Sequence, residues 1–260
     1  RSSAASDVYK RQVWQRVGAA GLSLLMWQLL SAAVGSPLLL PSPAAVLTRL
    51  AALVSEVSFW QSVWFSFCRI AGGFALALVL ATALSFAAGR FPVLDVLLRP
   101  YVLAVKSVPV ASFIILALIW MDTAALPLFI SFLMVFPILY TNILQGIRSA
   151  DPQLTEMARV FRVPWHRQVR GILLPAVEPF LLAGCATALG MSWKSGVAAE
   201  VIGVVSGSLG ERLYDAKIYL QTAELLSWTV VIVALSAAFE HLVLRLLRRL
   251  LRTLEGRHRL

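Results

Sequence analysis

Long apolar runs alternate with short polar segments along this 260-residue chain. Several runs exceed the ~18 residues that mark a membrane-crossing helix. The pattern predicts an all-α, polytopic membrane protein with six spans in one transmembrane domain, residues 13–255. The predicted spans are Val13–Val34, Gln61–Ala88, Pro100–Trp120, Ala124–Gly146, Ala176–Val205 and Leu225–Leu247.

Three segments outside the spans have their own patterns. After the first span, Pro43 can open a short helix with Leu47, Leu50 and Leu53 on one face, and we expect this helix to lie along the outer surface. Residues 1–12, RSSAASDVYKRQ, are polar and look like a translated adapter, so they are predicted to be non-native or disordered. Residues 256–260 form a basic tail.

Composition and charge support the membrane assignment. Hydrophobic residues make up 59% of the chain and charged residues 14%, whereas about a quarter of the residues of a soluble domain are charged. The net charge of +10 does not indicate nucleic-acid binding, because the basic residues lie between the apolar runs and form no soluble face with aromatic residues. The two cysteines and three histidines have no metal-ligand spacing.

The distribution of basic residues predicts the orientation. Of the 23 lysines and arginines, 17 lie in the N-terminal arm, the second and fourth connections and the tail, and three lie in the remaining connections. Because positive charge concentrates on the cytoplasmic side, both termini and the fourth connection, residues 148–175, are predicted to be cytoplasmic.

The fourth connection is unusually long and basic. Its stretch EMARVFRVPWHRQVRGILLP, residues 156–175, predicts a helix that starts at Glu156 with Thr155 as its cap, and Pro164 then separates it from a second short helix. Met157, Val160 and Phe161 share an apolar face of the first helix. Such a helix fits two interpretations, an element lying on anionic headgroups or a docking element for a cytoplasmic subunit.

The spacing of this stretch resembles the signature of bacterial ABC-importer permeases. That signature runs E-A-A, three residues, G, nine residues, I, one residue, L-P, and five positions fit its register: Glu156, Ala158, Ile172, Leu174 and Pro175. Met157 departs at the first alanine and Arg162 departs at the glycine. Stretches between residues 40 and 249, among them LPSP at 40–43 and GMSWKSGVAAEVIG at 190–203, look like permeases for nitrate, sulfonates and taurine.

The resemblance implies a set of partners. It implies two permease copies forming a homodimer, two ATPase subunits and an extracytoplasmic binding protein in the bacterial inner membrane. The chain has no phosphate-binding loop, so it is not expected to be an enzyme, and ATP and Mg²⁺ are expected on the ATPase rather than as cofactors of this chain. The implied coupling residues are Glu156, Met157, Ala158, Val160, Phe161, Arg162, Ile172, Leu174 and Pro175.

Charges inside the predicted spans are candidates for the cargo pathway. Arg69, Lys106 and Lys194 are all cationic, as an anionic cargo would require. Arg69 and Lys106 can instead extend to the nearer headgroups, and Lys194 can pair within the bundle. Trp193 and Ser195 beside Lys194 can add polar and stacking surface, and Glu200 is expected to cap or pair inside the bundle.

Two other functions and one other cargo are alternatives to this interpretation. A secondary transporter should show inverted repeats with interrupted helices, and the two halves lack convincing self-similarity. An intramembrane hydrolase built on Lys194 and Ser195 is disfavoured, because adjacent residues on a helix point about 100° apart and no histidine is suitably spaced. A thiamine-precursor pyrimidine remains an alternative cargo to a small anion.

Overall fold

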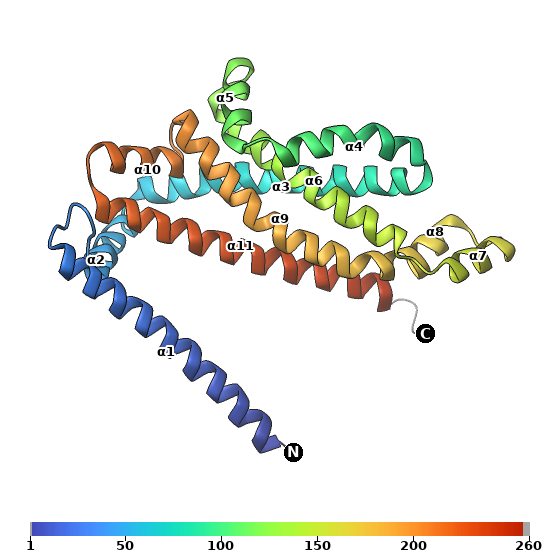
Figure 1. Cartoon of the computed structure of the whole chain (residues 1–260), viewed down its shortest axis with the longest axis horizontal. Helices are drawn as coiled ribbons and strands as arrows, with labels where there is room; N and C mark the ends of the chain where they lie inside the picture. Colours follow the sequence, from blue (N-terminus) through green and yellow to red (C-terminus); the bar gives the residue numbers. More distant parts are fainter. Residues whose placement is uncertain (1, 257–260) are drawn as a thin grey trace. The chain divides into compact units, whose positions relative to one another are not determined.

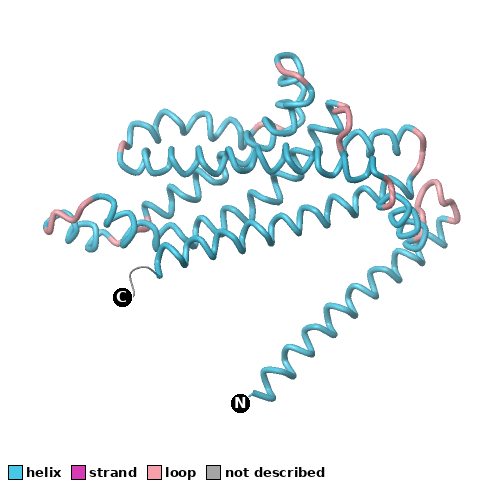
Figure 2. Tube along the Cα trace, turned by 180° about the vertical axis from the view of Figure 1, so that it is seen from behind, coloured by secondary structure: helices cyan, strands magenta, loops and turns pink. Residues whose placement is uncertain are grey.

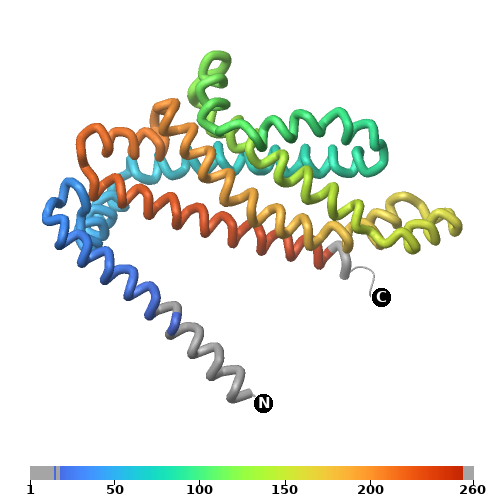
Figure 3. Tube along the Cα trace, in the orientation of Figure 1, coloured from blue at the N-terminus to red at the C-terminus, as the bar shows by residue number. Residues whose placement is uncertain are grey.

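The computed structural model describes the backbone of residues 2–256 and the side chains of residue 15 and residues 18–253 (Figure 3). The regular elements of this part of the chain are helical and joined by short loops, which confirms the all-α prediction (Figure 2). Their order is α1 (Ser2–Val34), α2 (Pro43–Val54), α3 (Val57–Arg90), α4 (Pro92–Ser107), α5 (Val110–Trp120), η1 (Thr123–Ala125), α6 (Leu126–Arg148), α7 (Pro152–Val160), α8 (Trp165–Gln168), η2 (Val169–Leu173), α9 (Leu174–Gly203), α10 (Leu209–Ile218) and α11 (Thr222–Gly256) (Figure 1).

The chain forms two compact units, and the first comprises residues 1–60 and 212–230. Helix α2 begins at Pro43 as predicted, with the Ser42 side chain accepting a hydrogen bond from the Ala45 amide over 3.2 Å. Arg49 of α2 forms a 2.7 Å ion pair with Glu224 of α11. The Phe59 and Trp228 rings stack with their centroids 5.1 Å apart.

The second unit comprises residues 61–211 and those from 231 on, and α6 packs along α9 at its centre. Glycines make this close approach possible, as expected where lipid removes the hydrophobic drive for helix association. A Cβ on Gly184 would lie 2.9 Å from Asn142, and one on Gly196 would lie 2.6 Å from both Ile70 and Ser131. Buried apolar side chains of α5, α6 and α9, including Ile114, Ile130 and Ala199, fill the core.

Within the part of the chain that the structure describes, four helical segments are long and apolar enough to cross a membrane: 57–90, 123–148, 165–203 and 222–253. A fifth crossing results if the bent pair α4 and α5 counts as one span. The chain is therefore a polytopic membrane protein, and these segments correspond to the predicted second, fourth, fifth and sixth spans.

The predicted third span, Pro100–Trp120, is not one continuous helix. A helix already starts at Pro92, ends at Ser107, and is followed by α5 at an angle of 107° (Figure 1). Pro109 explains the break, since a proline restricts the residue before it to extended backbone and Val108 has ψ of 134°.

Two of the predictions concern the ends of the chain. The basic tail predicted at residues 256–260 lies outside the described residues apart from the backbone of Gly256. The interpretation of residues 1–12 as a non-native or disordered segment stays a prediction.

Candidate functional site

The α6–α9 connection, residues 149–173, projects beyond the ends of α6 and α9 (Figure 1). Its first helix starts at Pro152 and not at Glu156, so the predicted cap at Thr155 is wrong. The Asp151 carboxylate accepts a hydrogen bond from the Gln153 amide over 2.8 Å, and proline follows it at the first helical position. The Thr155 hydroxyl instead donates to the Asp151 carbonyl over 3.0 Å.

Helix α7 ends in a Schellman turn around Arg162. The Val163 amide donates to the Ala158 carbonyl over 2.8 Å and the Arg162 amide donates to the Arg159 carbonyl over 3.1 Å. Arg162 has φ of 50°, the left-handed conformation that glycine adopts most easily. This chain therefore keeps the turn at the position where the sequence pattern expects glycine, although the residue is arginine. The turn, rather than Pro164, ends the first helix.

The α6–α9 connection has one buried side and one exposed, apolar side. Ala158 is 1% exposed, whereas Val160 and Phe161 are 72% and 74% exposed. Met157 is also exposed, and Trp165 adds a further exposed aromatic ring. Exposed apolar side chains gathered on a short helix are typical of a surface that another molecule covers.

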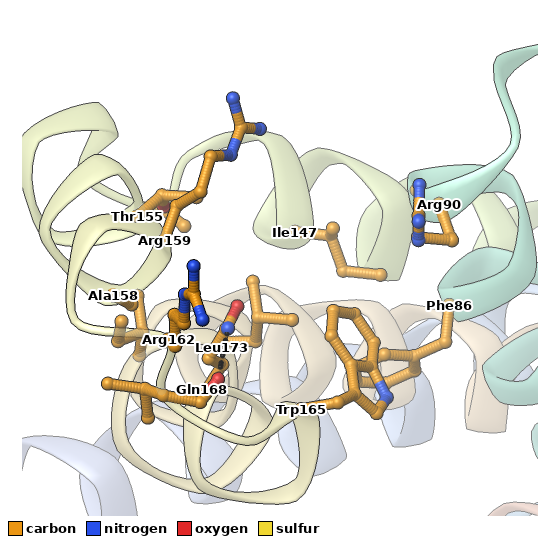
Figure 4. A pocket seen from close by; sticks show the side chains of 14 residues that line it. Phe86, Arg90, Ile147, Thr155, Ala158, Arg159, Arg162, Trp165, Gln168 and Leu173 are labelled. Carbon is orange, nitrogen blue, oxygen red and sulfur yellow. Dashed lines mark hydrogen bonds between the residues drawn. The ribbon is translucent and has the colours of Figure 1, made fainter.

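A cavity of about 750 Å³, the loop cavity, lies between this connection and the ends of α3 and α6 (Figure 4). Arg90 from α3 borders one side and Arg159 and Arg162 border the other, with Trp165 near Phe86 (Figure 4). The Gln168 side chain donates to the Val163 carbonyl over 2.6 Å and so fixes α8 against the turn. Ile172 also lines the cavity, while Leu174 and Pro175 begin α9.

A second cavity, of about 290 Å³, brings together three of the residues selected from the sequence: Lys106, Lys194 and Ser195. We call it the lysine cavity; the bend between α4 and α5 and the facing turns of α6 and α9 form its walls. The Lys106 ammonium donates to the Thr141 hydroxyl over 3.2 Å. Among the residues that the structure describes, the Lys194 ammonium has no hydrogen-bond or ion-pair partner. The remaining lining residues are Val105, Val108, Val110, Met134, Pro137, Ile138 and Met191.

The other residues selected from the spans lie elsewhere. Arg69 donates through Nε to the Ala124 carbonyl over 2.6 Å, and its guanidinium carbon is 3.5 Å from the Phe65 ring centroid. Trp193 is 1% exposed and packs among aromatic rings, with the Phe67 and Phe239 centroids each 6.3 Å away. The fully buried Glu200 accepts a hydrogen bond from the Gly210 amide over 3.1 Å, a capping contact at the start of α10.

A third cavity, of about 380 Å³, lies between α4 and α6 and was not predicted from the sequence. We call it the arginine cavity, because Arg99 and Arg148 line it together with Asp95, Val102, Tyr140, Thr141, Leu144 and Gln145. Asp95 forms a 2.7 Å ion pair with Arg148 and accepts a 3.0 Å hydrogen bond from the Tyr140 hydroxyl. The spacing of Asp95, Arg99, Val102 and Lys106 along one helical face is the signal that could have revealed it.

The chain is similar in sequence to known transport proteins. Residues 73–255 match the family described as the binding-protein-dependent transport system inner membrane component. The chain is 28% identical to SsuC of Bacillus subtilis, which carries the name of an aliphatic sulfonates transport permease, over 92% of this chain and 83% of that protein. It is 26% identical to the taurine transport system permease TauC of Escherichia coli, over 95% and 91%. It is 26% identical to the bicarbonate transport system permease CmpB of Synechococcus elongatus, over 75% and 70%.

Proposed function

Because the chain belongs to the family of binding-protein-dependent transport inner-membrane components, and is thus the permease of an ABC importer, we propose that it moves a small anion such as a sulfonate, taurine, nitrate or bicarbonate into the cell. This family works with an ATPase and a substrate-binding protein, and the permease is not itself an enzyme. Family membership also decides against the secondary transporter that the sequence left open.

The observation that supports an anionic cargo is the lysine cavity. Two ammonium groups from different helices, Lys106 of α4 and Lys194 of α9, line one space, and none of the described residues in its lining carries a carboxylate. A cation inside a membrane protein is costly unless it faces a pathway or a partner. An anionic cargo supplies that partner, and the Ser195 hydroxyl adds a hydrogen-bonding group to the same wall.

The α6–α9 connection is proposed to be the contact with the ATPase. Its exposed face, Met157, Val160 and Phe161, offers apolar anchors, and the buried Ala158 fixes that face to the turn at Arg162. Such a rigid element can transmit motion from a nucleotide-hydrolysing partner to the ends of α6 and α9. Glu156, Ile172, Leu174 and Pro175 complete the proposed coupling residues.

The membrane arrangement is proposed to comprise six spans with both termini in the cytoplasm. The four long spans and the bent α4–α5 pair give five crossings, and the apolar stretch Gly18–Val34 of α1 gives the sixth. We propose a homodimer, because Thr187, Met191 and Lys194 form an exposed stripe on α9 that places a charge on an uncovered face. A second copy covering this face would enclose the pathway.

Reconstitution tests the proposal. The permease, its ATPase and its binding protein are placed in lipid vesicles, and uptake of labelled methanesulfonate, taurine, nitrate, bicarbonate and a neutral aminopyrimidine is measured with and without ATP. We expect ATP-dependent uptake of one of the acids and none when the ATPase is omitted. Uptake of the pyrimidine alone, or uptake that persists without the ATPase, would contradict the proposal.

A further inference from the structure

The lysine and arginine cavities are neighbours along the same two helices. Lys106 lines the first and Thr141 the second, and the 3.2 Å hydrogen bond between their side chains joins the two linings. On α4, Arg99 and Lys106 lie seven residues apart, which is two helical turns on one face. On α6, Thr141 and Arg148 are likewise seven residues apart. Two facing stripes therefore line a continuous surface from the α4–α5 bend to the end of α6 beside the α6–α9 connection.

This surface is basic along its whole length. Lys194 and Lys106 line the part near the α4–α5 bend, and Arg99 and Arg148 line the part near the end of α6. Asp95 is the single carboxylate among the described residues that line the two cavities. Its carboxylate is occupied by Arg148 at 2.7 Å and by the Tyr140 hydroxyl at 3.0 Å.

We propose that the arginine cavity is the cytoplasmic half of the anion pathway, and that the Asp95–Arg148 ion pair is the contact that a departing anion exchanges with. The inference rests on the proposed function, and it adds a route and a residue pair for the same small sulfonates and oxyanions. Arg99 receives the anion from Lys106 and Thr141. Arg148 binds the anion when its guanidinium is released from Asp95, because a guanidinium has donors enough to exchange one oxyanion for another.

The ion pair is well placed for this exchange. The Asp95 side chain is 20% exposed and the Arg148 side chain 56% exposed, so the pair lies at a partly hydrated mouth where it can open without the large desolvation cost of a buried pair. The Tyr140 hydroxyl continues to donate to Asp95 when Arg148 leaves, so the carboxylate keeps one partner. Asp95 then competes with the anion for Arg148, and the return of the ion pair releases the anion.

The first test measures the electrostatic environment of the arginine cavity. Cys68 and Cys185 are replaced by serine and alanine, and Gln145, an exposed residue of this cavity, is replaced by cysteine. In the complete transporter, the labelling rates of a sulfonate-bearing and a trimethylammonium-bearing methanethiosulfonate are compared. We expect Arg99→Gln with Lys106→Gln to lower the anion-to-cation rate ratio about tenfold. Asp95→Asn should raise the ratio, and the control Arg245→Gln on α11 should leave it unchanged.

The second test measures ATP-driven uptake of labelled methanesulfonate by the same variants without the added cysteine. Arg99→Gln with Lys106→Gln should lower uptake about tenfold, and the charge-conserving Arg99→Lys with Lys106→Arg should retain most of it. Arg148→Gln should lower uptake by removing an anion ligand and the cation that pairs with Asp95, and adding Asp95→Asn should recover only part of it.

The outcomes separate the two claims. A wild-type transporter that imports none of the acids refutes the proposed function. Normal import by the wild type together with an unchanged rate ratio or unchanged uptake in Arg99→Gln with Lys106→Gln refutes only the route. A lowered rate ratio with normal uptake also refutes the route, because the cavity would then be basic without carrying the anion.

Discussion

The Val163 amide donates to the Ala158 carbonyl over 2.8 Å, and the turn closed by this bond holds Arg162 at φ of 50°. A side chain in the left-handed region costs roughly 1 kcal/mol relative to glycine. This strain lies in the segment that we propose as the contact with the ATPase, so it can be relieved without altering a membrane span.

Replacing Arg162 by glycine should therefore stabilise the α6–α9 connection. We expect Arg162→Gly to raise the free energy of unfolding by about 1 kcal/mol, seen as a higher thermal midpoint in detergent. The matched control is Arg159→Gly, which places glycine inside α7 and should lower stability by about the same amount. A lower midpoint for Arg162→Gly would contradict the assigned turn.

The exposed Phe161 ring should contribute directly to ATPase binding. Phe161 is 74% exposed in the isolated chain, and truncating a large aromatic anchor commonly costs an interface more than 1 kcal/mol. Phe161→Ala should weaken ATPase binding about tenfold in a pull-down titration and leave the permease folded. Phe91→Ala, which removes another exposed phenylalanine, should leave the affinity unchanged. Equal affinities for wild type and Phe161→Ala would remove this surface from the interface.

Enlarging the buried Ala158 should uncouple transport from ATP hydrolysis. Ala158 is 1% exposed, so Ala158→Trp must displace the turn that presents Val160 and Phe161. Membrane insertion should persist while uptake per ATP hydrolysed falls, whereas Ala158→Ser should retain coupling. Normal uptake by Ala158→Trp would show that the register of this turn is unimportant.

Two glycines of α9 provide a matched test of the packing. A Cβ on Gly196 would lie 2.6 Å from Ile70, whereas one on Gly190 would meet nothing within 4 Å in this chain. Gly196→Ala should destabilise the protein by about 1–3 kcal/mol through overpacking, while Gly190→Ala should be neutral or stabilising. Thermal unfolding of both variants in detergent checks this, and similar midpoints would contradict the α3–α6–α9 packing.

The sequence predicted the features that depend on local chemistry. Pro43 marked the start of α2, the long apolar runs located four spans closely, and the register of Glu156, Ala158 and Pro175 located the α6–α9 connection. The cap predicted at Thr155 was wrong, because Asp151 and Thr155 are both good capping residues. The preference of proline for the first helical position decides in favour of Asp151.

Features that depend on the packing of helices could not be predicted from the sequence. Lys106 and Lys194 are 88 residues apart, and only the packing of α4, α6 and α9 brings them to one cavity. The Asp95–Arg148 pair likewise joins two helices whose faces cannot be matched from a single sequence. The bend at Pro109, in contrast, had a readable signal, because a proline after Val108 opposes a continuous helix.

The most direct test of the account is uptake by vesicles that contain the complete transporter with both cavity lysines neutralised. Lys106→Gln with Lys194→Gln is compared with Lys106→Arg with Lys194→Arg, using the acid that the wild type imports and measuring ATP hydrolysis in parallel. Uptake should fall about tenfold or more in the glutamine variant and be largely retained in the arginine variant. Uptake by the glutamine variant at the wild-type rate would contradict an anion pathway through the lysine cavity.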